Sequence, residues 1–355
     1  EGTIPFFSNI SLIRWRCSHS KMSFAAKFTQ LYTTISVCVF LLWKWLTTGG
    51  KVFKKKDRGM PSKLLSNYNH KHALLPSGVN MHYVEAGEQS APLMVLIHGF
   101  PEFWYTWRFQ IEHFKDRYRV VAVDQRGYGE STKPPKIADY SQTLLAKDID
   151  DLIHELGYSD AVVVGHDWGA FVAWAHAILF PKSVRRLIIC NVPHQAAFGH
   201  LLKTNDRQWK MSWYMFFFQS PCVPEALIAA DDFKSLEEAF WSRKDGLRNK
   251  ANFTSEDMEA WKHTFSEPDC LRSAINYYRC KFQYPEDYKY EQKCTVKTLI
   301  LWGEEDPFLV KEGATLSAHE WCEDATLHFI PGASHWIQQD EPDVVNKHID
   351  EFLRA

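Results

Sequence analysis

Short, continuous apolar runs recur along the chain and alternate with segments of helical periodicity. The apolar runs predict buried strands over residues 93–97, 119–123, 161–164, 186–190, 296–301 and 326–330, and residues 81–86 alternate as in a strand with one polar face. Helical patterns cover residues 144–156 and 170–180, a segment from about 313, and residues 343–353. Strands that alternate with helices predict a mostly parallel, doubly wound α/β sheet.

The alternation stops between residues 194 and 293. Aromatic-rich helical segments replace the buried-strand runs there, over residues 209–219, 233–241, 255–265 and 269–282. We predict a helical cap over residues 194–293, inserted above the carboxyl edge of the sheet, where ligands bind in such folds. The core would then comprise residues 72–193 and 294–355.

The N-terminal region carries a different pattern. Residues 28–46 are moderately apolar and about long enough to span a bilayer. Trp43 and Trp45 suit a membrane interface. Basic residues follow, and the positive-inside rule places their side in the cytoplasm; they are Lys51, Lys54, Lys55, Lys56 and Arg58. The expected organisation is a leader over 1–27 with Met22 as a candidate start, a transmembrane anchor over 28–46 and a basic, polar linker over 47–71.

We therefore expect a single-pass membrane protein, most simply of the endoplasmic reticulum, whose catalytic domain faces the cytosol. An amphipathic or disordered leader is the alternative. The formal net charge of −2 over 355 residues gives no sign of nucleic-acid binding. The 8 cysteines show no CxxC pair and no zinc-ligand spacing, so we expect reduced thiols and no metal. The sequence indicates no oligomeric state.

The candidate chemistry centres on the turn between Gly165 and Gly169. A strand, a sharp turn flanked by glycines and a helix are typical of a nucleophile elbow, in which glycine lets neighbouring backbone come close. The apex residue is Asp167 instead of the usual Ser. An ionised carboxylate needs no base before it attacks an sp³ carbon, as in opening a strained ring or displacing a halide, and the product is an enzyme ester. The structural alternative for Asp167 is a cap of the following helix.

An ester on Asp167 would need a general base for its hydrolysis. His335 follows the last predicted strand and Asp306 follows the strand before it, which gives the chain order nucleophile, acid, histidine. We expect Asp306 to orient the imidazole, with Glu304 and Glu305 as competing acids.

The loop after the first central strand, residues 98–101, is expected to supply an oxyanion donor. The two donors would be the backbone amides of Phe100 and Trp168. Pro101 would fix this loop through a cis bond after Phe100. An apolar substrate tunnel is expected from the rings of Trp104, Trp107, Trp168 and Trp336.

Four motifs together resemble the α/β-hydrolase-fold epoxide hydrolases, namely residues 98–101, 124–131, 166–169 and 334–336. The basic N-terminal anchor and the run over residues 98–105 look most like the membrane-anchored epoxide hydrolase 4 group. The resemblance covers the chain from about Leu75 to its end. It implies an enzyme that opens lipophilic epoxides, such as epoxy fatty acids, to vicinal diols without a metal or organic cofactor.

The family holds the epoxide oxygen with two tyrosines of the cap. The matching positions are Tyr214, five residues before Gln219 in an aromatic run, and Tyr278, in the segment 276–279 of sequence Asn-Tyr-Tyr-Arg. A phenol can donate to a developing alkoxide without ionising first. Tyr277 is the rival for the second position, and both tyrosines could instead be ordinary cap aromatics.

There are three alternatives to an epoxide hydrolase: a dehalogenase, a serine hydrolase and a protein without catalytic activity. Haloalkane dehalogenases would share Asp167, Trp168 and His335, but their first loop resembles His-Gly-Asn-Pro, where this chain has Phe100. Fluoroacetate dehalogenases usually place Arg at the position of Trp168. A serine hydrolase is disfavoured because the sequence contains no G-x-S-x-G. The third alternative is a catalytically silent, membrane-tethered protein that has kept the fold.

Overall fold

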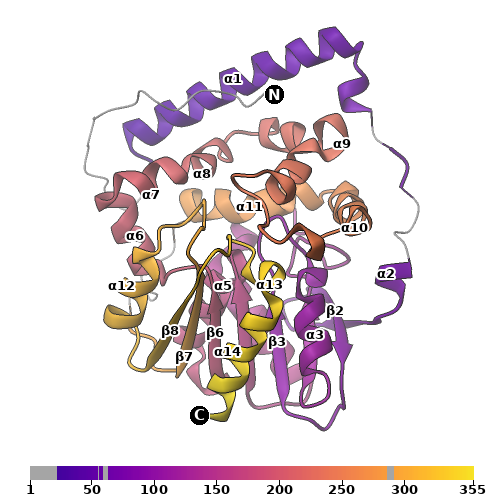
Figure 1. The fold of residues 1–355 in the computed structure, drawn as a ribbon. Helices are drawn as coiled ribbons and strands as arrows, with labels where there is room; N and C mark the ends of the chain where they lie inside the picture. Colours follow the sequence, from indigo (N-terminus) through magenta and orange to yellow (C-terminus); the bar gives the residue numbers. More distant parts are fainter. Residues whose placement is uncertain (1–21, 55, 59–62, 286–291) are drawn as a thin grey trace.

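The computed structural model describes residues 22–54, 56–58, 63–285 and 292–355. An eight-stranded sheet in the order β1-β2-β4-β3-β5-β6-β7-β8 forms its centre (Figure 1). The strands are β1 Asn69–Leu74, β2 Asn80–Ala86, β3 Leu93–Ile97, β4 Arg119–Val123, β5 Ala161–His166, β6 Val184–Cys190, β7 Thr298–Gly303 and β8 Ala325–Ile330. The β1–β2 and β2–β4 pairs are antiparallel and the other five are parallel. The predicted mostly parallel α/β sheet is confirmed.

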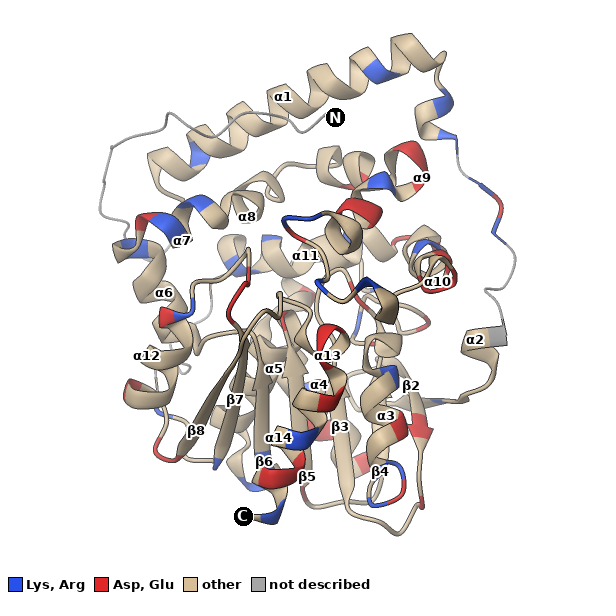
Figure 2. Cartoon of the chain, viewed as in Figure 1, with Lys and Arg blue, Asp and Glu red and all other residues tan. Residues whose placement is uncertain are grey.

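Helices cover both faces of this sheet (Figure 1). They are α3 Arg108–Phe114, α4 Gln142–Glu155, α5 Trp168–Leu179, α12 Glu312–Glu320, α13 Ile337–Asp340 and α14 Pro342–Arg354, with short 3₁₀ turns at η2 Trp104–Trp107, η3 Ile137–Tyr140 and η4 Pro181–Ser183. Every residue of β3, β4 and β5 is buried. Burial on both faces explains why these strands are continuous apolar runs. Figure 2 shows the charged residues on helices and loops around them.

The expected helical cap is present between β6 and β7 (Figure 1). It consists of α6 Gln195–Thr204, α7 Asp206–Met211, α8 Trp213–Phe217, α9 Val223–Trp241, η5 Lys250–Asn252, α10 Ser255–Ser266 and α11 Cys270–Gln283. These helices lie over the carboxyl ends of the parallel strands, so side chains from strand ends and cap helices can meet there.

The N-terminal part begins with α1 Phe24–Thr48 and continues through η1 Lys51–Phe53 and α2 Lys63–Ser66. Within the described residues, α1 alone is long and apolar enough to cross a membrane. It extends across the outer side of the cap, beside α8 and α9 (Figure 1). Residues 1–21 of the expected leader, Lys55 and residues 59–62 of the expected linker lie outside the described residues. The sequence pattern did not predict β1, which follows α2.

Candidate active site

The turn after β5 presents Asp167 at the carboxyl edge of the sheet. Its backbone has a φ of 49°, an unusual value for a residue with a side chain, which costs on the order of 1–3 kcal/mol. A Cβ added to Gly169 would lie 2.1 Å from the carbonyl oxygen of Ile97, so the turn can pack against β3 only with glycine there. Asp167 makes no side-chain capping bond to α5 in the described part of the chain.

The loop after β3 faces the same carboxylate. The backbone N–H of Phe100 donates to Oδ1 of Asp167 over 2.7 Å. The bond between Phe100 and Pro101 is cis, as expected from the sequence. A Cβ on Gly99 would lie 2.3 Å from the Cβ of Asp167, so this close approach also requires glycine. The loop therefore holds a backbone donor against one oxygen of Asp167 and leaves the second oxygen for another partner.

That partner is His335, which follows β8. Its Nε2 lies 3.4 Å from Oδ2 of Asp167, and its Nδ1 lies 2.7 Å from Oδ2 of Asp306. Asp306 is held further by the backbone amides of Phe308 and Leu309, which donate to its Oδ1 over 2.7 and 2.9 Å. The imidazole thus bridges two buried carboxylates, and Asp306 fixes its orientation.

The charges around His335 set its protonation. Burial alone lowers the pKa of this imidazole, but the opposite charges and hydrogen bonds of Asp306 and Asp167 outweigh burial and raise the pKa to about 10. With both carboxylates ionised, His335 is therefore an imidazolium at neutral pH. If the charge of Asp167 were removed, one of the two groups that raise this pKa would be lost, and His335 would release its proton more readily.

Of the three candidate acids in the loop after β7, Asp306 is the one that contacts His335. Glu304 instead lies 3.5 Å from Nζ of Lys311, and Glu305 pairs with Nε of Arg248 over 2.8 Å. Both glutamates are directed toward basic surface residues. The geometry therefore favours Asp306 in the orienting role.

The two cap tyrosines lie over this group of residues. The ring of Tyr278 contacts Phe100, Trp168 and Tyr214 at centroid distances of 5.5, 5.0 and 5.9 Å. Burial, and next the negative charge of Asp167, raise the pKa of Tyr214 and Tyr278 above the ordinary value for a phenol. Both hydroxyls therefore keep their protons and can donate them.

The neighbouring Tyr277 is directed elsewhere. Its ring packs against Tyr128, Tyr140 and Trp168, but its hydroxyl donates to the backbone carbonyl of Arg126 over 2.7 Å. Tyr277 therefore joins α11 to the loop after β4. Of the two adjacent tyrosines, Tyr278 is the one that faces the residues around Asp167.

The four tryptophans expected in a tunnel divide into two pairs. Trp168 packs against Tyr278, and Trp336 lies 5.1 Å from the ring of His335. Trp104 instead contacts Tyr68 and His70 beside β1, which β2, β4 and β3 separate from β5. Trp107 is fully buried in the hydrophobic core. The structure therefore brings Trp168 and Trp336 to the candidate site, but not Trp104.

Sequence patterns missed the residues that support the site from behind. The carboxylate of Glu102 accepts from the backbone N–H of Gly99 and lies 2.7 Å from Nδ1 of His166, whose Nε2 lies 2.8 Å from the carbonyl oxygen of His335. Glu102 and His166 thereby join the loop after β3, the elbow and the loop after β8. The sequence could have indicated both residues, because Glu102 directly follows the motif at residues 98–101 and His166 belongs to the motif at residues 166–169.

Asn191, the residue after β6, was also missed. Its Nδ2 donates to Oδ2 of Asp306 over 2.7 Å, and its Oδ1 accepts from the backbone N–H of Gly303. Asn191 has a φ of 55°, a conformation that asparagine tolerates better than most residues. The side chain thus donates to the same oxygen of Asp306 that His335 contacts and helps to fix the orienting carboxylate. The position of Asn191 directly after a central strand could have indicated that its side chain lies at the site.

The described residues include one group that could hold a metal ion. Ligand atoms of His70, His82 and Glu130 lie within 4.8 Å of one another. His82 and His70 belong to β2 and β1, and the group includes none of the residues around Asp167. The chemistry at Asp167 can be described with protein groups alone.

Comparisons with known proteins agree with this geometry. A family profile described as alpha/beta hydrolase fold matches residues 92–342. Epoxide hydrolase 2 of Caenorhabditis elegans is 44% identical over 323 residues, which cover 91% of this chain and 90% of that protein. Epoxide hydrolase 4 of Homo sapiens is 41% identical over 320 residues, 88% of each chain.

A solved structure is similar over the same region. The Bacillus megaterium epoxide hydrolase in complex with an inhibitor has a TM-score of 0.72 and 31% sequence identity to this chain, and the match covers 80% of this chain and all of that one. These similarities confirm the resemblance that the four motifs predicted.

Proposed function

The chain belongs to the α/β-hydrolase fold family, and we propose that it is an epoxide hydrolase that opens lipophilic epoxides to vicinal diols. The observation that carries this proposal is the environment of Asp167. One carboxylate oxygen accepts from the Phe100 amide, the other lies 3.4 Å from His335, and two tyrosines that keep their protons lie in the cap above. This arrangement offers a nucleophile on one side of an epoxide and acids on the other.

In the first step, Oδ2 of Asp167 attacks an epoxide carbon and the carbon–oxygen bond of the ring breaks. The epoxide oxygen takes a proton from Tyr214 or Tyr278, which hold it from the cap. Oδ1 remains on the Phe100 amide and becomes the carbonyl oxygen of the new ester. The residues that shape this space are aromatic, which favours a lipophilic substrate.

In the second step, the ester must be hydrolysed. Esterification removes the charge of Asp167, so His335 can give its proton back to the tyrosine that was ionised in the first step. The neutral imidazole, which Asp306 keeps oriented, then takes a proton from a water molecule. Water adds to the ester carbonyl, and the amides of Phe100 and Trp168 stabilise the oxyanion. The diol then leaves and Asp167 is restored.

We further propose that epoxy fatty acids are substrates and that α1 attaches the enzyme to the membrane of the endoplasmic reticulum. The basic residues after α1 suit the anionic cytosolic leaflet and so support a cytosolic catalytic domain. Protease digestion of sealed microsomes tests the orientation, because protection of the domain would place it in the lumen.

The assay that tests the proposed activity is conversion of an epoxy fatty acid to its diol by the full chain. Diol formation is expected from the wild-type chain. A chloroalkane in the same assay tests the dehalogenase alternative through chloride release. Chloride release without diol formation would overturn the proposal, and so would failure to act on any of a panel of lipophilic epoxides.

A further inference from the structure

The helix α1 exposes a face of large apolar side chains, whereas several of its polar side chains contact the cap. Each of the outward-facing side chains exposes 50% to 65% of its surface; they are Phe28, Leu31, Ile35, Val39, Leu42 and Leu46. Their spacing of three or four residues puts them on one face of the helix. A helix on the surface of a water-soluble protein has the opposite arrangement. The outward face of α1 is therefore suited to an apolar surrounding.

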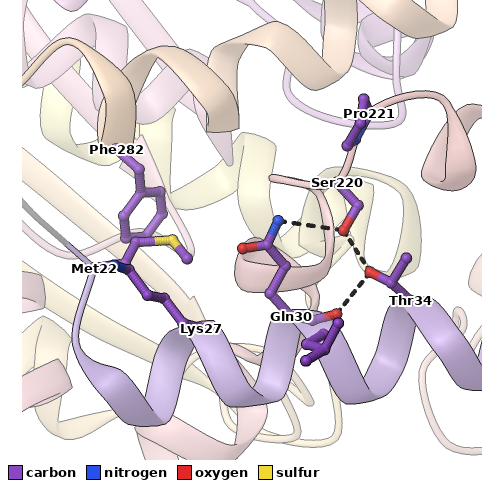
Figure 3. A pocket seen from close by; sticks show the side chains of 8 residues that line it. Met22, Lys27, Gln30, Thr34, Ser220, Pro221 and Phe282 are labelled. Atoms are coloured by element: carbon purple, nitrogen blue, oxygen red, sulfur yellow. Dashed lines mark hydrogen bonds between the residues drawn. The ribbon is translucent and has the colours of Figure 1, made fainter.

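The inward face makes specific polar contacts with the cap. The hydroxyl oxygens of Thr34 and Ser220 lie 2.5 Å apart, and Nε2 of Gln30 donates to the same Ser220 oxygen (Figure 3). Ser220 belongs to the segment between α8 and α9. Thr34 lies near the middle of α1, so these contacts hold the central turns of the helix against the cap.

A second set of contacts holds the C-terminal end of α1 and the segment after it. Nζ of Lys44 lies 2.7 Å from Asp231, and Asp232 pairs with Lys56 over 2.8 Å and also with Arg58. These are opposite charges placed face to face. Figure 2 shows that α1 carries no charge between its two lysines, which are Lys27 and Lys44. Lys44 ends this uncharged stretch at the point where the cap supplies a carboxylate.

The cap adopts an unusual backbone to present these carboxylates. Asp231, Asp232 and Phe233 have φ values of 48°, 60° and 63° and interrupt the regular helix of α9. Left-handed conformations of residues with side chains cost roughly 1 kcal/mol or more each. Ala230, just before them, is buried against Leu41 of α1 and Val52 of η1. The strained residues of α9 therefore lie where the cap contacts the end of α1 and the segment after it.

From these observations we propose that α1 lies in the plane of a lipid bilayer, with its apolar face in the acyl region and its polar face on the cap, instead of crossing the bilayer. A crossing helix would carry Thr34 about 15 Å from either surface of a hydrocarbon core roughly 30 Å thick, and Ser220 could not follow it there. An in-plane helix keeps both sets of cap contacts and transfers the exposed apolar side chains from water to lipid. The exposed Trp43 and Trp45 suit the interface.

This arrangement has a consequence for the cap. A groove of about 520 Å³ runs between α1 and the cap (Figure 3). Its lining is mixed, with the polar residues Lys27, Gln30, Thr34 and Ser220 beside the apolar residues Met22, Leu31, Pro221 and Phe282. Leu31 also belongs to the outward apolar face, so the groove opens at the level of the bilayer. The inference is independent of the chemistry at Asp167.

Disulfide cross-linking of the full chain on vesicles of phosphatidylcholine and phosphatidylserine tests the proposal. The thiols that are exposed among the described residues are first removed by Cys38→Ser and Cys222→Ser, and Cys17, which lies outside those residues, is changed to Ser as well. The test pair is Thr34→Cys with Ser220→Cys. The matched control is Ser36→Cys with Ser220→Cys, because Ser36 is an exposed α1 residue whose hydroxyl donates to the backbone carbonyl of Tyr32 within the same helix.

On vesicles, the test pair is expected to give a roughly tenfold higher disulfide yield than the control pair, because a disulfide needs Cα atoms within about 7 Å. Equal yields, or cross-linking of the test pair in detergent but not on vesicles, would overturn the proposal. Failure of the chain to bind the vesicles would overturn it as well.

Probe depth gives a second measurement that does not depend on a disulfide. A fluorescent label on Ile35→Cys is expected to be quenched by acyl-chain quenchers several-fold more than a label on Ser36→Cys, because the two side chains point to different sides of an in-plane helix. In a crossing helix these neighbours differ in depth by only about 1.5 Å. Equal quenching of the two labels would therefore show that α1 crosses the bilayer.

Discussion

The candidate active site and α1 place polar and apolar groups in opposite ways. Around Asp167, carboxylates and an imidazole are buried under aromatic rings. On α1, a face of large apolar side chains is exposed, whereas Gln30, Thr34 and Lys44 contact the cap. Each region therefore fits a different surrounding. The active site excludes water to strengthen its charges, and α1 faces a medium that is itself apolar.

The polar contacts of the two regions also differ in strength. Asp306 is buried and bonded to His335, Asn191 and two backbone amides, and a buried charge is tolerated only with such a full set of partners. The pair between Lys44 and Asp231 is about one third exposed on each side, and such pairs contribute roughly 0–1 kcal/mol. The cap contacts can therefore orient α1, but burial of its apolar face in lipid would supply most of the binding free energy.

Removing the buried nucleophile should produce the largest effect. Asp167→Ala is expected to lower kcat/KM for an epoxide by at least about 10³-fold, as losses of catalytic nucleophiles do. Membrane binding should not change, because α1 is untouched. Circular dichroism and vesicle sedimentation are the controls. Turnover that survives this substitution would mean that the nucleophile lies elsewhere.

The cap tyrosines should show the next largest effect. Tyr214→Phe and Tyr278→Phe are each expected to lower kcat by about 10- to 100-fold, because each removes one proton donor to the epoxide oxygen. Tyr277→Phe is the matched control: its hydroxyl bonds to the Arg126 carbonyl, so kcat should change little. If Tyr277→Phe had the larger effect, the assignment of Tyr278 would be wrong.

A charge on the apolar face of α1 should affect binding and leave catalysis intact. Ile35→Asp is expected to weaken vesicle binding by roughly tenfold or more, since a buried carboxylate opposes insertion into lipid. Ser36→Asp adds the same charge to the adjacent residue, which lies on another side of the helix, and should weaken binding less. Both variants should keep the wild-type kcat on a water-soluble epoxide. Equal losses of vesicle affinity would contradict the in-plane arrangement.

The pH dependence of stability should show the smallest effect. The folded state raises the pKa of His335 from about 6.5 to about 10, so its ion pairs stabilise the fold fully below pH 6.5 and this contribution is lost as the pH rises through 10. Chemical denaturation should show the free energy of unfolding of the wild type falling over this range more than that of His335→Gln. Parallel pH profiles would show that His335 is not held as an imidazolium.

Much of the fold could be predicted from the sequence because apolar runs follow from burial on both faces of the sheet. The runs at β3, β4 and β5 have no exposed residue, and the carboxyl ends of parallel strands meet at one edge. The sequence therefore placed Asp167, Asp306 and His335 in one candidate site, although they are far apart along the chain. β1 was missed because it lies at the sheet edge, mostly exposed, where no apolar run is required.

The remaining parts depend on contacts between distant residues. Asn191 and Glu102 act through hydrogen bonds that local patterns do not encode, and the ring direction of Trp104 depends on packing beside β1. The same holds for α1. Its composition predicts a membrane segment, but only the contacts of Thr34 and Lys44 with the cap show which face is turned toward the protein.

Mass spectrometry of the His335→Gln variant tests the covalent role of Asp167 most directly. Without the base, the ester on Asp167 should accumulate, so the intact mass should increase by the full mass of the added epoxide and the modified peptide should contain Asp167. The double variant Asp167→Ala with His335→Gln should show no increase. An unmodified His335→Gln protein after incubation with an epoxide that the wild type hydrolyses, or an adduct on another residue, would contradict the account.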